Sequence, residues 1–246
     1  MATPSSPWLA GSVLPQPRLR LIVFPYAGGG PGAFTHWRPQ LPRDVELRVA
    51  QLPGHGARLT ELPLRHMERL VSPLAMALLP LGPLVFYGHS LGAFVAFEVA
   101  RYLRRLRHGQ LLKLIVSGQR APQLPQRTAV VHAWPDAEFI ADLRAQQGTS
   151  EEVLRNAELM QLLLPMLRAD FALCETYRYR DEPPLAVPLT AWGGDADPKV
   201  TQAELAAWQV QTQGHFTQRS FPGGHFFLHT QEAALWAALQ AELALH

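Results

Sequence analysis

The chain has 246 residues, of which 48% are hydrophobic and 17% are charged, and its formal net charge is +2. A chain of this length and composition can bury one large core, so we expect a single domain of enzyme size. The near-neutral charge gives no reason to expect a nucleic-acid partner. The only cysteine, Cys174, excludes an internal disulfide framework and favours a reducing compartment.

Membrane insertion and secretion are not expected either. No apolar stretch reaches the roughly 18 residues that a membrane span needs. The N-terminus has neither the basic nor the apolar segment of a signal peptide. We therefore expect a cytoplasmic protein that does not bind membranes. Residues 1–17 are rich in Pro and Ser, which predicts a flexible N-terminal lead-in before a single domain of residues 18–246.

The first predicted strand, residues 19–24, runs into a glycine-rich loop at residues 25–30. Consecutive glycines let the backbone approach a ligand closely. A phosphate-binding loop is one reading, but neither the dinucleotide spacing nor a following Gly-Lys-Ser/Thr is present. A second reading is a loop that donates a backbone N–H to a substrate carbonyl, and we favour Ala27 as that donor.

Strands and helices then alternate along the chain. This alternation predicts a mainly parallel sheet with helices on both faces. The predicted elements are a helix at 33–41, a strand at 45–50, a helix at 67–79, a strand at 83–87, a helix at 91–106 and a strand at 114–118.

The motif Gly88-His89-Ser90-Leu91-Gly92 lies between the strand at 83–87 and the helix that follows it. A serine on a sharp turn between strand and helix is typical of a nucleophile elbow. Glycines must flank it, because side chains there would collide with the neighbouring strand and helix. The N–H of Leu91 would be the second oxyanion donor. A tight turn with Ser90 as a helix N-cap explains the glycines but not the residues described next.

Residues 121–185 contain no convincing strand, which predicts a helical lid inserted over the strand ends. Two helical stretches, 136–146 and 150–179, are expected, and Pro165 should break or kink the second. Apolar side chains of the second stretch could line an acyl pocket or pack the lid onto the core; they are Met160, Leu163, Met166, Leu167 and Phe171.

A catalytic acid is expected after the strand near residue 189. Asp195 and Asp197 both lie in the polar turn that follows it. Asp197 precedes a proline and holds the usual place of the acid in an α/β-hydrolase, whereas Asp195 is more plausible as a turn former.

The base should follow the acid along the chain, and with the terminal His246 set aside, His215, His225 and His229 remain of the ten histidines. His225 follows a strand and two glycines, where the base belongs. His215 is expected at the start of that strand, and His229 as an exposed neighbour. The order Ser90, Asp197, His225 thus predicts a catalytic triad.

Six motifs, spread in order over residues 19–240, resemble those of type II thioesterases, the stand-alone partners of nonribosomal peptide and polyketide synthases. They are Phe24-Pro25-Tyr26-Ala27-Gly28-Gly29, Leu52-Pro53-Gly54, Gly88-His89-Ser90-Leu91-Gly92, Ser117-Gly118-x-x-Ala121-Pro122, Leu164-Pro165-x-x-Arg168-Ala169-Asp170-Phe171 and Phe221-Pro222-Gly223-Gly224-His225-Phe226. His55 stands in a segment that varies in the family and is given no role. For residues 168–171 we expect lid packing and an Arg–Asp pair.

The resemblance implies an α/β-hydrolase fold with an inserted helical lid. It places the triad at Ser90, Asp197 and His225, with the oxyanion donors at Ala27 and Leu91. It also implies hydrolysis of acyl groups from the phosphopantetheine arm of acyl or peptidyl carrier domains, which would clear blocked arms. Neither a metal nor an organic cofactor is required, and we expect a monomer.

Other functions remain open. The same triad would serve a general carboxylesterase or a medium-chain fatty acyl-carrier thioesterase. If the triad were inactive, the chain would instead be a non-catalytic interaction protein with a hydrolase fold. A carrier domain is expected to dock near the mouth of the site, beside Arg58 and Arg120. A cluster on the helix after the elbow should lie at the far end; it comprises Arg101, Arg104, Arg105 and Arg107.

Overall fold

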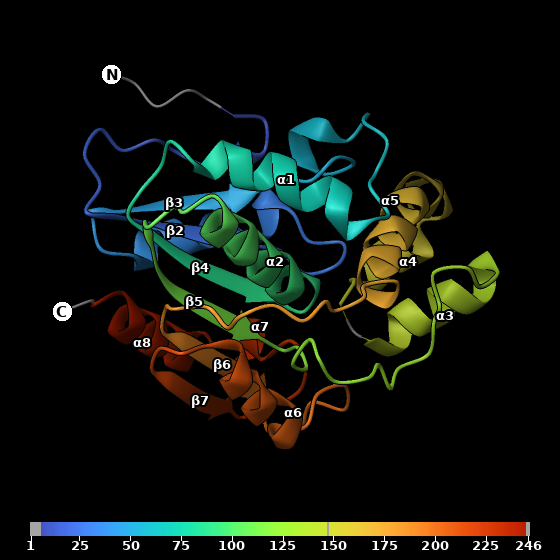
Figure 1. The fold of residues 1–246 in the computed structure, drawn as a ribbon. Coiled ribbons are helices and arrows are strands. Elements are labelled where there is room, and N and C mark those ends of the chain that lie inside the picture. Colours follow the sequence, from blue (N-terminus) through green and yellow to red (C-terminus); the bar gives the residue numbers. More distant parts are fainter. Residues whose placement is uncertain (1–5, 147, 245–246) are drawn as a thin grey trace.

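The computed structural model describes residues 6–146 and 148–244, and its centre is a twisted β-sheet (Figure 1). Within those residues the sheet has seven strands in the order β1-β3-β2-β4-β5-β6-β7. β1 is antiparallel to β3, and the other neighbouring pairs are parallel. The predicted mainly parallel sheet is therefore confirmed. The strands are β1 (Leu9–Ala10), β2 (Leu19–Phe24), β3 (Val45–Ala50), β4 (Leu84–His89), β5 (Leu111–Ser117), β6 (Leu189–Gly194) and β7 (Phe216–Phe221).

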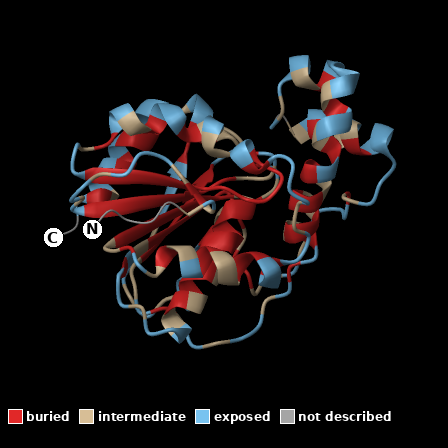
Figure 2. Cartoon of the chain, turned by 90° about the horizontal axis from the view of Figure 1, so that it is seen from above, coloured by how far each residue is buried: buried red, intermediate tan, exposed pale blue. Residues whose placement is uncertain are grey.

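Helices cover both faces of the sheet. Every residue of β2 and β4 is buried, as near-continuous apolar runs predict for parallel strands. Successive side chains point to opposite faces, so Ile22 joins the core on one face and Val23 the core on the other. Figure 2 shows these buried strands between two outer layers of helices whose far sides are exposed.

Each face has its own set of helices. The first face packs against α1 and α2, and the second against η1 and α8. The helices are η1 (Pro31–Gln40), η2 (Gly56–Arg58), α1 (Met67–Leu78), α2 (Leu91–Arg105), α3 (Asp136–Gln146), α4 (Glu151–Arg155), α5 (Ala157–Glu175), α6 (Gln202–Ala206), η3 (Ala207–Gln211), α7 (Phe227–Thr230) and α8 (Glu232–Leu243). Among the described residues, no helix combines the length and the apolar character needed to cross a membrane.

The N-terminal segment is more ordered than its composition suggests. Residues 1–5 lie outside the described part of the chain, but Leu9 and Ala10 pair with Ala50 and Val49 at the edge of the sheet. Leu9 is buried in the core beside β3. The expected flexible lead-in through residue 17 does not account for this strand, because two residues are too few to give a periodic signal.

The segment between β5 and β6 contains the helices α3, α4 and α5, which lie together beyond the end of the sheet where β4 meets α2 (Figure 1). We call residues 121–185 the lid segment. Its helices share a separate apolar cluster that includes Phe139, Leu154 and Leu164. The segment is thus held by its own small core.

The expected break at Pro165 is wrong, since α5 continues through this residue. The helical stretch divides instead at Asn156, between α4 and α5. The side-chain oxygen of Asn156 accepts a hydrogen bond from the N–H of Leu159 at 3.0 Å. Asparagine is among the best N-caps, so local capping sets the start of α5.

Candidate active site

Ser90 lies on a strained turn between β4 and α2. Its backbone has φ 53° and ψ −118°, which side-chain-bearing residues rarely adopt. A Cβ on Gly88 would lie 2.2 Å from the carbonyl oxygen of Gly92, and one on Gly92 would lie 1.9 Å from that of Phe24. Only glycine fits at these two positions, so the motif permits a turn that exposes the serine hydroxyl.

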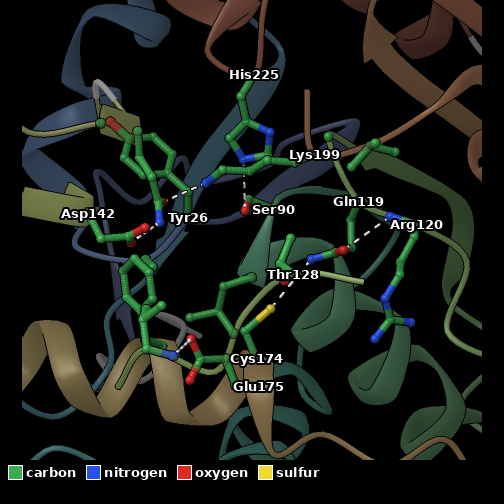
Figure 3. A pocket seen from close by; sticks show the side chains of 18 of the residues that line it. Tyr26, Ser90, Gln119, Arg120, Thr128, Asp142, Cys174, Glu175, Lys199 and His225 are labelled. Carbon is green, nitrogen blue, oxygen red and sulfur yellow. Dashed lines mark hydrogen bonds between the residues drawn. The ribbon is translucent and has the colours of Figure 1, made fainter. Parts of the chain in front are cut away.

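The structure brings Ser90, His225 and Asp197 into one hydrogen-bonded chain (Figure 3 shows the first two). His225 Nε2 lies 3.0 Å from Ser90 Oγ, and His225 Nδ1 lies 2.8 Å from Asp197 Oδ2. The three residues follow β4, β7 and β6. Because parallel strands end at the same edge of a sheet, these distant segments meet there.

The two aspartates after β6 have different partners. Asp197 is buried, and its second oxygen accepts the N–H of Lys199 at 2.8 Å. Asp195 is exposed and accepts the N–H of Gly223 at 2.9 Å, so it ties the turn after β6 to the loop that carries His225. The geometry therefore gives Asp197 the contact with the imidazole and Asp195 a role in the loop.

Burial keeps His225 neutral. Desolvation is the largest influence and lowers its pKa, and the hydrogen bond and charge of Asp197 oppose it without reversing the direction. The fully buried His89 packs against it at 5.1 Å between ring centroids, and burial also places the pKa of His89 well below the ordinary value. Two neutral rings leave Nε2 of His225 free to accept a proton.

Ala27 and Leu91 line the same cavity as Ser90. Leu91 is the first residue of α2, where an N–H has no acceptor within the helix and the helix dipole favours negative charge. Ala27 lies in a turn closed by a 2.8 Å hydrogen bond from the Gly29 N–H to the Tyr26 carbonyl. This loop packs against the lid, because Leu167 fills the space beside Gly28.

The cavity beside Ser90 has a volume of about 340 Å³. Of the five predicted pocket residues only Phe171 is among those that line it. The other four belong to the apolar cluster of the lid segment; they are Met160, Leu163, Met166 and Leu167.

Much of the cavity wall is polar. Lys199 Nζ lies 2.5 Å from Gln146 Oε1, and the amide of Gln146 donates to Asp142 at 2.5 Å, next to Ser90 and His225 (Figure 3). Cys174 also lines the cavity, where burial raises its pKa to about 11. That Asp142, Gln146 and Lys199 line the cavity could not be predicted from the sequence, because Lys199 lies far along the chain from the other two and the three form no local motif. Among the described residues, no group of three or more His, Cys, Asp or Glu side chains could hold a metal ion.

The expected pair between Arg168 and Asp170 is absent, because residues two apart on a helix point in different directions. Arg168 instead contacts Asp136 at 2.5 Å. Asp170 points to the core, where its Oδ2 accepts from Gly28 N at 2.7 Å and lies 2.9 Å from His55 Nε2.

The two expected docking arginines are engaged within the chain. Arg58 is buried and binds Glu61, and Arg120 donates to the carbonyl of Leu124. The arginines of α2 converge on Glu182, which follows the lid helices; they are Arg101, Arg104 and Arg105 at 2.9, 2.5 and 2.6 Å. This cluster holds the C-terminal part of the lid segment against α2.

The chain matches known proteins over most of its length. A family model described as "Thioesterase domain" matches residues 19–242. The gramicidin S biosynthesis protein GrsT of Aneurinibacillus migulanus is 44% identical over 214 residues, which are 86% of this chain and 84% of GrsT. Thioesterase PikA5 of Streptomyces venezuelae is 42% identical over 222 residues, which are 88% of this chain and 78% of PikA5.

A solved structure agrees with these matches. The type II thioesterase BorB from the borrelidin biosynthetic cluster superposes on the chain with a TM-score of 0.89. The two are 35% identical, and the superposition covers 98% of this chain and 99% of BorB.

Proposed function

The chain belongs to the thioesterase domain family, and from that premise we propose that it hydrolyses acyl groups from the phosphopantetheine arm of carrier domains. Its homologues include type II thioesterases of nonribosomal peptide and polyketide pathways. The observation that carries the proposal is the hydrogen-bonded chain from Ser90 through His225 to Asp197. A nucleophile, a base and an orienting acid in this order can cleave a thioester through an acyl-enzyme.

The proposed reaction has two halves. His225 Nε2 takes the proton of Ser90 as Oγ attacks the thioester carbonyl. The backbone N–H groups of Leu91 and Ala27 donate hydrogen bonds to the oxyanion that forms. The carbon–sulfur bond then breaks, and His225 returns the proton to the departing thiol. In the second half His225 deprotonates water, which attacks the acyl-serine carbonyl. The bond between the acyl carbon and Ser90 Oγ then breaks, His225 returns the proton to Oγ, and the free acid is released.

The names of the relatives support a carrier-bound substrate. GrsT is named for gramicidin S biosynthesis, and BorB comes from the borrelidin biosynthetic cluster. Release of an unwanted acyl group would return the carrier thiol to use. We propose that this chain performs that step as a cytoplasmic monomer.

The cavity wall combines apolar side chains such as Leu143 and Phe171 with buried polar groups, and we propose that the polar groups favour short or polar acyl groups over medium-length alkyl chains. An alkyl chain in this space would lie against Lys199 and Gln146. It would displace water from these polar groups and could not replace the hydrogen bonds that the water makes. We therefore propose a preference for small or polar acyl groups, which separates this function from that of a medium-chain thioesterase.

Competition between a carrier thioester and a simple ester tests the proposed function. Acetyl and octanoyl groups on a phosphopantetheinylated carrier protein would be compared with p-nitrophenyl acetate, with Ser90→Ala as the blank. We expect kcat/KM to be highest for the acetyl carrier and lower for the octanoyl carrier. Faster turnover of the ester than of either carrier would instead indicate a general carboxylesterase.

A further inference from the structure

A buried contact joins the lid to the loop that carries the Ala27 N–H. Asp170 of α5 is 2% exposed and His55 is 4% exposed. One carboxylate oxygen of Asp170 receives both the Gly28 N–H at 2.7 Å and His55 Nε2 at 2.9 Å. Three segments of the chain, around residues 28, 55 and 170, therefore meet at a single oxygen atom.

The partners of His55 fix its protonation state. Its Nδ1 lies 3.2 Å from the carbonyl oxygen of Pro53, which can only accept a hydrogen bond. The Asp170 oxygen accepts the Gly28 N–H, and as a carboxylate oxygen it can accept from His55 Nε2 as well. An imidazolium at His55 satisfies both contacts, because both of its ring nitrogens donate.

The electrostatic surroundings of His55 also favour its protonated form. Burial alone would lower the pKa of His55, but the charge and hydrogen bond of Asp170, together with backbone hydrogen bonds at Pro53 and Leu52, raise it above the ordinary value. The side chain of the nearby Arg58 forms an ion pair with Glu61. The remaining charged groups on the neighbouring elements are also turned elsewhere, since Arg168 of α5 pairs with Asp136 and the loop at 25–30 has no charged residue.

This contact bears on the oxyanion hole through peptide geometry. The Ala27 N–H and the Tyr26 carbonyl belong to one peptide plane, and the Gly29 N–H holds that carbonyl at 2.8 Å. The next plane carries the Gly28 N–H, which Asp170 holds at 2.7 Å. With both planes fixed, the orientation of the Ala27 N–H is fixed as well, and Ala27 is one of the residues that line the cavity. A bare carboxylate this close would repel an oxyanion, and the charge of His55 offsets it.

We propose that Asp170 and a protonated His55 form a buried ion pair that holds residues 25–30 in the geometry needed for the oxyanion hole. Both are positioning residues, because they act through Gly28 and Ala27 rather than on the substrate. The proposal rests on the proposed acyl-enzyme mechanism. It links the lid to catalysis through one residue of α5.

The pH dependence follows from these charges. The pair is intact at low pH, where His55 is protonated, and is lost as pH rises through the raised pKa of His55. The uncharged ring can make only one of the two donor contacts and carries no charge to pair with Asp170. We therefore expect kcat of the native chain to decline on the alkaline side.

Three variants would be compared on acetyl-N-acetylcysteamine, a thioester that needs no carrier. Asp170→Ala removes the acceptor of Gly28 and should lower kcat about 10-fold or more while KM stays within about twofold. Asp170→Asn can still accept from Gly28 and from the Nε2–H of a neutral His55 through its one amide oxygen, so it should keep most of kcat and lose the alkaline decline. Arg168→Ala, two residues earlier on α5, removes a contact within the lid and should leave kcat near the native value.

The outcomes separate this proposal from the proposed function. Loss of all turnover in Ser90→Ala supports the mechanism whatever Asp170 does. The positioning proposal is overturned if Asp170→Ala matches Arg168→Ala in kcat, or if only its KM rises. If Asp170→Ala does not fold, Asp170→Asn decides alone: an alkaline decline identical to that of the native chain would overturn the proposal.

Discussion

At the scale of single residues, the turn at Ser90 shows how sterics fix the position of the proposed nucleophile. The positive φ of Ser90 is held by β4 on one side and α2 on the other, and Gly88 and Gly92 leave no room for a Cβ. Within this turn the positive φ of a non-glycine residue falls on Ser90, the proposed nucleophile. Such a turn is recognisable in sequence because the glycines it needs are adjacent to the serine.

The two aspartates after β6 should respond differently to amidation. Asp197→Asn removes the charge that stabilises the imidazolium and can hold His225 in the wrong tautomer, so kcat should fall about 10³-fold or more. Asp195→Asn can still accept the Gly223 N–H and should cost less than about threefold. Steady-state kinetics on one thioester would decide, and a larger loss for Asp195→Asn would reverse the assignment.

The acid limb of the pH profile should report His225. Its pKa lies below the ordinary value of 6.5 because of burial, so the base stays neutral as pH falls to that value. We expect the acid limb of kcat/KM to have its midpoint below 6.5, on the acid side of the decline that we assign to His55. A midpoint clearly above 6.5 would show that burial does not dominate the titration of His225.

At the scale of elements, local motifs were readable from sequence and long-range contacts were not. Strand, turn and capping residues lie next to the features they determine, which is why the fold class could be predicted and why Ser90 and the loops with Asp197 and His225 could be singled out. The contact between His55 and Asp170 spans 115 residues and leaves no local pattern. The lining of the cavity depends on how α5 is rotated about its axis, which hydrophobic periodicity alone does not fix.

The arginines of α2 should act on stability rather than on carrier binding. Arg104 pairs with Glu182, and its side chain is only 27% exposed. Arg104→Glu would place two carboxylates together and should lower the free energy of unfolding by about 1 kcal/mol or more. KM for an acyl carrier protein should not change, since this end of α2 lies away from Ser90.

Arg107→Glu is the matched control, because Arg107 is an exposed neighbour of the same cluster. Chemical denaturation should find this variant close to the native chain. A tenfold rise in KM for the carrier in Arg104→Glu, with normal turnover of a small thioester, would instead identify the cluster as a docking surface.

At the scale of the whole molecule, the sheet and the lid segment make complementary contributions. The sheet brings the loops after β2, β4, β6 and β7 to one edge, and these supply the oxyanion loop, Ser90, Asp197 and His225. The lid adds Phe171, Asp142 and Gln146 to the cavity and reaches back to the core through Asp170. The cavity is thus lined from both the sheet edge and the lid segment.

Mass spectrometry of a trapped acyl-enzyme tests the central claim most directly. The chain would be mixed with an acetylated carrier protein, quenched in acid within milliseconds and digested with protease. We predict an added acetyl group on the peptide that contains Ser90, absent in Ser90→Ala and more abundant in Asp197→Asn if deacylation is slowed more than acylation. Free acid released at the native rate by Ser90→Ala, or an acyl group found only on another residue such as Cys174, would contradict the account.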